Sequence, residues 1–545
     1  MKLRNIKFII TSVAVLGMTA CTKLDQRLQS TFTTNPAGSN PDVVSLLNGA
    51  YNDANGLLHG QDQIFSLEEN TADECLVPTR GGDWDDNGVW RVLHSHNWQV
   101  THGQTTSVFS GLGQLESDAI STLAFNPSPQ QKAEAYFLRS VAQFYLLDLY
   151  GQVPYRTIAD YNAITAAPVL GPEAAIDTLI ATLTSIIPSL PANTSNATAG
   201  RANQDAARFL LMKVYLNKGA WLHRSAPTFD PADMAQVIAL GTTIQANGYS
   251  LTPNYFDNFG PHNGSLGKEA IWAWPNNGTA SNNGINGGGI NARWMMTLHY
   301  NSWDQQNSYG GAGWNGFSTV ASFYNTFEGS GNSTIDTTKD SRLGGRFYPG
   351  VTDQSGLRPG LLVGLQKNEA GVGEVDRHGN PLAFTPDVAL VETDANTLEV
   401  AGIRIVKYGP DYANYSGGHQ NNQLQIFRYA DVLLMMAEAY LRTTDAGGTG
   451  PALTLVNQIR QARGASTLAS ISLVNASNTY DPGTLLAERG RELYWESWRR
   501  QDLIRFGVYL IPWDLKTSDD PKNLLFPIPQ AQIIANPNLK QNPGY

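Results

Sequence analysis

Two segments of the chain combine tryptophans with polar side chains in a pattern that is typical of carbohydrate binding. The first, residues 80–98 (RGGDWDDNGVWRVLHSHNW), holds Trp84, Trp90 and Trp98 among acidic, amide and arginine side chains. A tryptophan ring stacks on the apolar C–H face of a sugar, while charged and amide groups bind its hydroxyls. The sequence therefore predicts a sugar-binding surface, with about half of these tryptophans expected in the core.

The second segment, residues 275–316, is rich in glycine and asparagine but also contains aromatic side chains. Loops of this length in compact proteins are usually functional or disordered, and disordered segments contain few aromatic residues. We therefore expect ordered loops that take part in binding. The side chains predicted to contact the ligand are Asp73, Arg80, Asp83, Trp84 and Trp90 in or near the first segment, and Trp294, Tyr300, Trp303 and Trp314 in the second.

Metal binding is poorly supported by these residues. Asp83, Asp85 and Asn87 match the first half of a calcium loop, but the twelfth position holds His94 where a glutamate is required. His94 and His96 lack a supporting carboxylate at a metal-motif spacing, so a role in the core or at the surface is favoured. We expect no metal and no cofactor, with calcium kept as a minor alternative.

Catalysis is also poorly supported. A glycosidase needs two carboxylates beside the scissile bond, and any chain with 47 acidic residues offers such pairs, here for example Glu68, Asp73, Asp83 and Asp85. The sequence contains no Gly-x-Ser-x-Gly elbow, no Walker A loop and no His-Glu-x-x-His helix. It therefore predicts a protein that is not an enzyme.

The N-terminus has the pattern of a bacterial lipoprotein signal. Lys2, Arg4 and Lys7 precede a short apolar stretch at 8–16, and small residues then lead to Cys21. The apolar stretch is too short to span a bilayer stably. A cysteine at the cleavage point predicts acylation, and two or more acyl chains give stable attachment to a membrane. We predict a signal peptide at 1–20 and lipidation of Cys21.

Beyond the signal, the chain is acidic. The signal contributes three basic residues and no acid, so the remainder carries 34 basic and 47 acidic residues, a formal charge of −13. This balance disfavours nucleic acid and a basic membrane-binding patch. No later stretch approaches about 18 continuous apolar residues, so we expect a soluble body joined to the anchor by a polar tether at 21–40. Cys75, the one remaining cysteine, excludes an internal disulfide and two-cysteine metal motifs.

Helices must position these loops, and four segments have the spacing of amphipathic helices: 133–150, 204–218, 427–442 and 453–464. Gly151 and Gly219 stand where the first two are expected to end. Alanine- and tyrosine-rich helices in close pairs are typical of helical-repeat scaffolds. Ordinary amphipathic core helices fit the same pattern, because no strict repeat consensus is visible.

A fifth helix is predicted over 487–507. It mixes acids and arginines at helical spacing, which predicts three ion pairs: Glu488 with Arg491, Glu496 with Arg500, and Asp502 with Arg505. We expect this helix to have a structural role.

The same segment resembles the C-terminal signature of the SusD/RagB family, outer-membrane lipoproteins of nutrient uptake in Bacteroidetes-type bacteria. The matching residues are Arg491, Glu492, Leu493, Glu496, Arg499, Asp502, Leu503, Arg505 and Gly507. Residues 428–439, 134–154 and 526–545 are similar to three other stretches of that family, in the same order along the chain.

The resemblance implies a mainly α fold, a tetratricopeptide-like helix-pair scaffold with large irregular loops and a few short strands. We expect the body to span 41–545, with scaffold at about 41–250 and 425–510 and ligand-binding loops at 251–424. It further implies an outer-membrane protein that binds oligosaccharide or polysaccharide and delivers it to a SusC-like TonB-dependent transporter. A peptide- or protein-binding member of the family is the alternative, and a surface glycosidase is less favoured. Ligand-contact residues vary within the family, so the resemblance assigns none.

Overall fold

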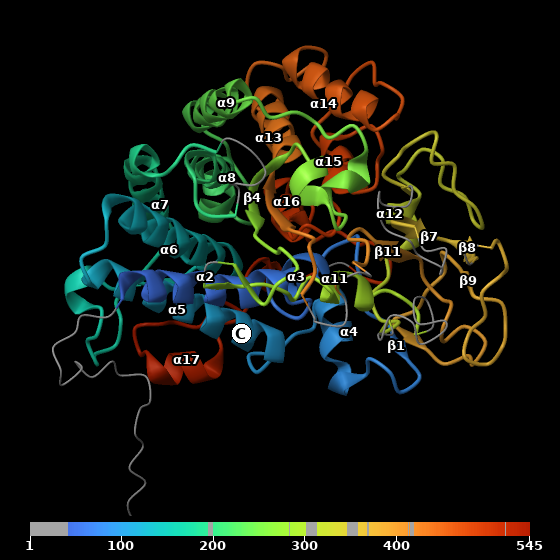
Figure 1. Cartoon of the computed structure of the whole chain (residues 1–545), viewed down its shortest axis with the longest axis horizontal. Helices are drawn as coiled ribbons and strands as arrows, with labels where there is room; N and C mark the ends of the chain where they lie inside the picture. The colour runs from blue at the N-terminus through green and yellow to red at the C-terminus, as the bar shows by residue number, and fades with distance from the viewer. Residues whose placement is uncertain are drawn as a thin grey trace, which may run out of the picture. The chain divides into compact units, whose positions relative to one another are not determined.

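Long helices packed in sequence form the first half of the protein. The computed structural model describes residues 42–193, 200–282, 284–300, 313–345, 358–367, 370–411, 414, 419–517 and 519–545. The long helices of the first half are α2 (Val43–His59), α5 (Gly103–Ala124), α6 (Pro129–Tyr150), α7 (Pro172–Ile186), α8 (Gln204–Leu222) and α9 (Pro231–Ala246). Helix α5 packs against α2 and α6, α7 contacts both α6 and α8, and α9 packs on α8 (Figure 1).

A second set of helices near the C-terminus extends this array. It consists of α13 (Tyr429–Leu441), α14 (Pro451–Ala462), α15 (Leu485–Leu493) and α16 (Arg499–Arg505). Helix α13 packs against α9 on one side and against α14 and α15 on the other, so the array passes from the first half of the chain to the last (Figure 1). The predicted mainly α fold built from paired helices is confirmed.

Short elements lie between these two sets and at their edges. Strand β4 (Ala270–Trp274) pairs antiparallel with β12 (Leu424–Arg428), and all their residues are buried. The remaining strand pairs are β1 (Thr79–Arg80) with β10 (Val391–Glu392), β2 (Val153–Pro154) with β3 (Val169–Leu170), β5 (Ser281–Asn282) with β6 (Ile285–Asn286), β7 (Gly360–Leu362) with β11 (Arg404–Val406), and β8 (Gly364–Leu365) with β9 (Ala383–Phe384). The short helices are α3 (Ile64–Glu69), α4 (Val89–His94), α10 (Asn263–Leu266), α11 (Ala292–Met295), α12 (Ala321–Tyr324) and α17 (Gln530–Ala535).

Local sequence explains where α6 begins and ends. The Ser128 hydroxyl accepts a hydrogen bond from the Gln131 amide, and the Gln131 side chain accepts one from the Ser128 amide, which completes a capping box. Pro129 occupies the first turn, where its missing N–H costs no helical hydrogen bond. Gly151 ends the helix at φ 70°, a conformation that favours glycine. The helix predicted at 133–150 is confirmed.

Helix α8 differs from its prediction because Gly219 has another function. The helix continues through Gly219 to Leu222. A Cβ at position 219 would lie 1.5 Å from the carbonyl oxygen of Thr228, so this glycine allows a neighbouring loop to approach the helix backbone. The glycine marks a close contact and not a helix end.

The segment predicted as one helix over 487–507 forms two helices, α15 and α16. Trp495 and Ser497 have φ values of 57° and 67° between them, which interrupts helical geometry. The predicted pairs Glu488–Arg491 and Asp502–Arg505 are present, each at 2.6 Å. The Glu496–Arg500 pair was wrong, because the break removes the helical spacing. Glu496 instead binds Arg428 at 2.8 Å and also Lys407, while Arg500 lies 3.8 Å from Asp148.

A group of carboxyl side chains is buried around α3. Glu69 accepts hydrogen bonds from the amides of Ser497 and Trp498 and lies beside Glu74. Burial raises the pKa of Glu74 to about 7, and burial together with the adjacent Glu74 raises that of Glu69 well above its usual range. The folded protein therefore binds more protons here than the unfolded chain does between about pH 4.5 and 7.

This group predicts a pH dependence of stability. Because the folded state holds the extra proton, its contribution to the free energy of unfolding falls as pH rises through that window. Glu69→Gln keeps an acceptor for the two amides and removes one titrating group. The difference in stability between the variant and the parent should therefore shift in favour of the variant when the pH is raised from about 5 to about 8. Urea unfolding midpoints at both pH values measure this. The comparison between the two proteins cancels the opposite effect of buried histidines such as His96, whose pKa burial lowers to about 4. Equal pH dependence in both proteins would contradict the prediction.

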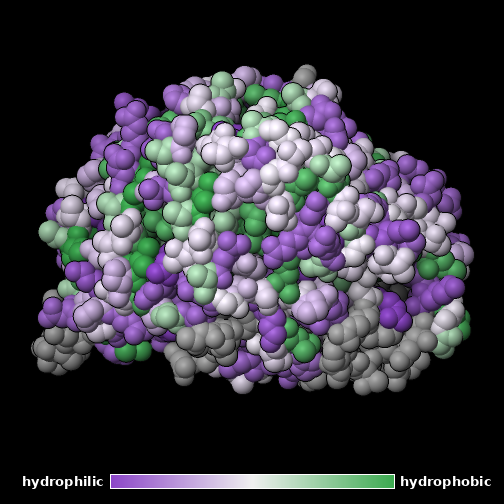
Figure 2. Space-filling view, turned by 90° about the horizontal axis from the view of Figure 1, so that it is seen from above, coloured by the Kyte–Doolittle hydropathy of each residue, from purple (hydrophilic) through white to green (hydrophobic). Residues whose placement is uncertain are grey.

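The anchor predicted at Cys21, the signal at 1–20 and the tether at 21–40 all lie outside the described residues. From Val43 to Tyr545 the chain forms one unit. The helices of the described residues include none that is long and apolar enough to cross a membrane. On the face shown in Figure 2, hydrophobic residues are interspersed among hydrophilic ones. Cys75 is buried with a free thiol.

Candidate functional site

The tryptophan-rich segment begins with a tight loop that connects β1 to α4. Strand β1 pairs in parallel with β10, which ties this loop to residues more than 300 positions later. Five residues of the loop, Gly81, Trp84, Asp86, Asn87 and Gly88, have positive φ values between 39° and 80°. A bulky residue such as tryptophan rarely adopts this conformation, and such residues cluster at functional sites.

Trp84 is the partly exposed aromatic side chain at the centre of this loop. Its indole N–H donates to the carbonyl oxygen of Trp314 at 2.7 Å. Its ring contacts those of Trp90 and Phe317 edge-on, each with a centroid distance of 5.5 Å. A Cβ at Gly316 would lie 2.4 Å from the indole, so only glycine leaves room for the ring in this position. These contacts hold one ring rigidly while part of it stays open to solvent.

A row of polar side chains begins at Asp83, the residue that precedes Trp84 in the loop. The Tyr300 hydroxyl donates to a carboxylate oxygen of Asp83, and the Arg377 guanidinium stacks over the Tyr300 ring at 3.7 Å from its centroid. Burial, with a further contribution from Asp83, raises the pKa of Tyr300 to about 12, so the hydroxyl stays a donor. The side chains of Asp83 and Arg377 are 51% and 48% exposed, and both can therefore reach a ligand.

Glu399 fixes the position of the Arg377 side chain. Its Oε1 binds the Arg377 Nε at 2.6 Å, and its Oε2 lies 2.7 Å from the Nε2 of His299. Burial alone would raise the pKa of Glu399, but the hydrogen bonds from Arg377 and His299 lower it below its usual value. The carboxylate is thus ionised and orients the arginine.

Several predicted contact residues are buried and support the loops from within. Arg80 is 3% exposed and donates to Ser318 Oγ and to the carbonyl oxygens of Gly316 and Leu398. Burial lowers its pKa to about 10, a value at which the guanidinium is still charged at neutral pH. Trp90 is 5% exposed, and its indole donates to Asp86 at 2.8 Å. Both residues shape the site without facing a ligand.

Two of the predicted contact residues, Asp73 and Trp294, lie in the core. Asp73 is fully buried in a two-point ion pair with Arg499, at 2.6 and 2.9 Å. Trp294 is fully buried in α11. Neither side chain can touch a ligand at the surface. Trp314 is partly exposed beside Trp84, and Trp303 lies outside the described residues.

The carboxylates of the calcium-like motif have partners within the protein. Asp83 binds Tyr300, and Asp85 pairs with Arg91. Elsewhere in the described residues, ligand atoms of Asp376, His378 and Glu399 lie within 4.8 Å of one another. Since Arg377 already occupies Glu399, a cation at this position would have to displace the arginine.

The histidines considered as metal ligands form contacts within the protein core. The two ring nitrogens of His94 lie 3.0 and 2.8 Å from the carbonyl oxygens of Cys75 and Asp514. His96 contacts the carbonyl oxygen of Thr71 and the carboxylate of Asp519. Each ring therefore joins segments that are distant in sequence.

Arg377, Glu399 and His299 were not predicted from the sequence. Residues 374–380 (EVDRHGN) look like an ordinary charged turn, and nothing local indicates that Arg377 stacks on Tyr300. The signal that placed Tyr300 in the site was the density of aromatic residues, and it could not reveal the arginine above the ring.

Paired helices that carry ordered loops with a partly exposed aromatic ring define the class of the protein: a tetratricopeptide-like scaffold that presents a surface for binding. Comparison with known proteins narrows this class. The SusD family model matches residues 268–516. The starch-binding protein SusD of Bacteroides thetaiotaomicron is 24% identical over 90% of this chain and 88% of its own length. The chain is therefore similar to the SusD family over residues 268–516 and to this named relative over most of its length.

Solved structures show the same similarity at the level of the fold. A SusD superfamily protein from Parabacteroides distasonis aligns with a TM-score of 0.66, at 18% identity, over 92% of this chain and 98% of that one. Surface glycan-binding protein A from Bacteroides thetaiotaomicron, in complex with laminarihexaose, aligns with a TM-score of 0.63, at 17% identity and with the same coverage.

Proposed function

We propose that this protein binds an oligosaccharide or polysaccharide without cleaving it and that the Trp84 loop carries the binding surface. The observation that supports this most directly is the Trp84 ring, fixed by Trp314 and Gly316, in a loop whose Asp83 binds Tyr300 and Arg377. The ring offers an apolar platform for a sugar face, and the polar row offers donors and an acceptor for its hydroxyls.

The relatives support this ligand class. One is named a starch-binding protein, and another was solved with laminarihexaose. Neither name describes an enzyme, which agrees with the lack of a catalytic motif in this sequence. The ligand of this chain is therefore proposed as a glycan, with its sugar and linkage left to experiment.

The proposed function includes delivery. We infer from the family resemblance and from the lipoprotein signal that the body is anchored at the outer membrane through Cys21 and passes glycan to a SusC-like TonB-dependent transporter. Anchoring raises the effective concentration of the binding protein near its transporter, so a modest affinity for glycan is sufficient.

Affinity gel electrophoresis against a panel of polysaccharides tests the binding function. Retardation by one polysaccharide, with no released product on chromatography of the mixture, is the expected result. Hydrolysis of that polysaccharide would favour a surface glycosidase. Failure of the whole panel, with binding of peptides in a parallel assay, would favour a peptide-binding member of the family.

Replacement of the anchor predicts separate effects on binding and uptake. Cys21→Ala should leave retardation in the gel unchanged, because the ligand surface lies far along the chain from residue 21. It should impair growth on the bound glycan, since the binding protein would no longer be held near the transporter. Growth rates of strains with the parent and the variant gene measure this effect. Normal growth of the variant strain, with the protein confirmed in the soluble fraction, would argue against the anchor.

A further inference from the structure

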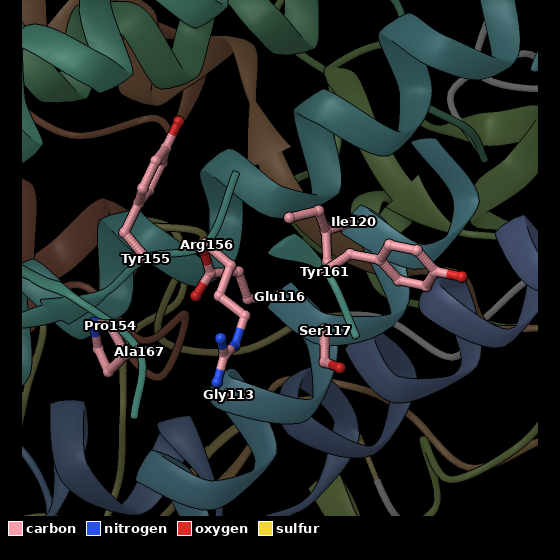
Figure 3. Close-up of a pocket in the computed structure, with 9 residues that line it drawn as sticks. All are labelled: Gly113, Glu116, Ser117, Ile120, Pro154, Tyr155, Arg156, Tyr161 and Ala167. Carbon is pink, nitrogen blue, oxygen red and sulfur yellow. The ribbon is translucent and has the colours of Figure 1, made fainter. Parts of the chain in front are cut away.

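A pocket lies on the helical scaffold, beside the C-terminal half of α5. It has a volume of about 140 Å³ and is formed by α5, β2 and the segment that follows β2. Its lining includes Glu116, Ser117, Tyr155, Arg156 and Tyr161 (Figure 3). None of these residues belongs to the Trp84 loop or its polar border.

Glu116 is held in the pocket wall so that one carboxylate oxygen remains available. Its Oε1 accepts hydrogen bonds from Arg139, through Nε at 3.2 Å and Nη2 at 3.0 Å, and from Gln143 at 3.2 Å. Its Oε2 accepts no hydrogen bond from the residues that the structure describes. The residue is 7% exposed, so water reaches this oxygen only through the pocket. This oxygen opens into the pocket from a mostly buried side chain and can therefore accept a hydrogen bond from a ligand bound there.

Arg156 supplies donors to the same space. It makes one side-chain hydrogen bond among the described residues, from Nη2 to the carbonyl oxygen of Thr165. Its charge acts on Glu116 without a direct ion pair between the two groups. Figure 3 shows the Glu116 carboxylate and the Arg156 side chain at the centre of the pocket residues. The pocket thus presents an acceptor and unused guanidinium donors side by side.

The presence of both a carboxylate and a guanidinium group in the pocket favours a ligand without net charge. An anion would meet the Glu116 carboxylate, and a cation would meet Arg156, so each would be repelled by one of the two groups. Two neighbouring hydroxyls on one ligand suit both groups, because one hydroxyl donates to Oε2 and the other accepts from the guanidinium. Ser117 offers a further hydroxyl partner, while Ile120, Pro154 and the two tyrosines provide apolar surface for a C–H face.

We propose that this pocket binds a single pyranose unit through two vicinal hydroxyls, as a saccharide site separate from the Trp84 loop. The volume agrees with this size of ligand, since pockets for drug-sized molecules are usually larger, about 300 Å³ or more. A site of this kind would let the helical scaffold contact a chain end or branch of the glycan while the loops bind another part of it.

Saturation-transfer NMR with methyl glycosides of glucose, galactose and mannose tests the proposal on the whole mature protein. At least one glycoside should show saturation transfer at millimolar concentration. The signal should persist in Trp84→Ala and weaken at least about tenfold in Glu116→Gln and in Arg156→Ala, with no change in Gln114→Ala, an exposed residue of the same helix. Glu116→Gln retains an oxygen for Arg139 but replaces the free acceptor with a donor.

Three results would overturn the proposal: saturation of no glycoside, a signal that survives both pocket variants, or preferential binding of acetate or methylammonium. If Glu116→Gln does not fold, as judged by its thermal unfolding, the half-buried Arg156 carries the test alone. Failure of this pocket is distinguishable from failure of the proposed function, because polysaccharide retardation should depend on Trp84 and monosaccharide binding on Glu116 and Arg156.

Discussion

Trp84→Ala is expected to abolish retardation of the protein by its polysaccharide. The variant loses the one partly exposed ring that the loop holds rigidly, and truncation of an aromatic residue at the centre of a binding site usually costs about 2 kcal/mol or more. That loss corresponds to an affinity at least about thirtyfold weaker. Relative mobility in gels with increasing polysaccharide measures the change, and thermal unfolding verifies that the variant is folded.

Two matched variants separate the ring from its surroundings. Gly316→Ala keeps Trp84 but places a methyl group where a Cβ would lie 2.4 Å from the indole, so it should displace the ring and weaken binding as well. Tyr215→Ala removes a partly exposed aromatic side chain from α8 and should leave binding unchanged. Unchanged mobility in both Trp84→Ala and Gly316→Ala would refute the assignment of the binding surface.

Among the substitutions proposed for this protein, Glu492→Ala is expected to cause the largest loss of stability. Its carboxylate is fully buried and accepts hydrogen bonds from Arg463 and Arg428, both at 2.8 Å, and from Arg342 at 3.3 Å. Burial alone would raise its pKa, but Arg463 and Arg428 lower it, so the group is ionised in the folded protein. Removal of this carboxylate leaves three buried guanidinium groups with less negative charge to balance them. Loss of one partner of a buried ion pair typically costs about 3–5 kcal/mol.

Urea and thermal unfolding measure this loss, with Glu173→Ala as the control. Glu173 lies exposed on α7, and its replacement should change the free energy of unfolding by less than about 0.5 kcal/mol. A comparable midpoint for Glu492→Ala and Glu173→Ala would show that the arginines find other partners. It would also remove the structural explanation for the family signature around this residue.

The parts of the fold that local sequence controls could be predicted. The cap at Ser128 and the glycine at 151 set the ends of α6 within the chain itself. Helix spacing likewise located α13 and α14, whose apolar residues face the neighbouring helices. The break between α15 and α16 could not be predicted, because it depends on Glu69 and Glu74, which accept hydrogen bonds from the backbone of residues 495, 497 and 498.

The candidate site could be predicted only in part for the same reason. Trp84, Asp83, Tyr300 and Trp314 were found from aromatic and polar composition, and the structure brings them together. Composition could not distinguish these residues from Asp73, whose partner Arg499 lies 426 positions away. It also gave no reason to choose Arg377 among the other arginines, since stacking on Tyr300 is a tertiary contact.

Arg80 is buried at the start of the Trp84 loop, whereas the polar side chains next to the loop are exposed, and this difference has a consequence for the evolution of the protein. Arg80 ties the loop to Ser318 from a buried position, so its replacement would destabilise the fold. The Asp83 side chain is about half exposed and its polar contacts among the described residues are with Tyr300 and Arg377, and substitutions at such positions usually change stability by less than about 0.5 kcal/mol. Selection can therefore alter the ligand preference of this surface through a few border residues while the scaffold stays intact, and the same residues are the natural positions for a library aimed at new glycans.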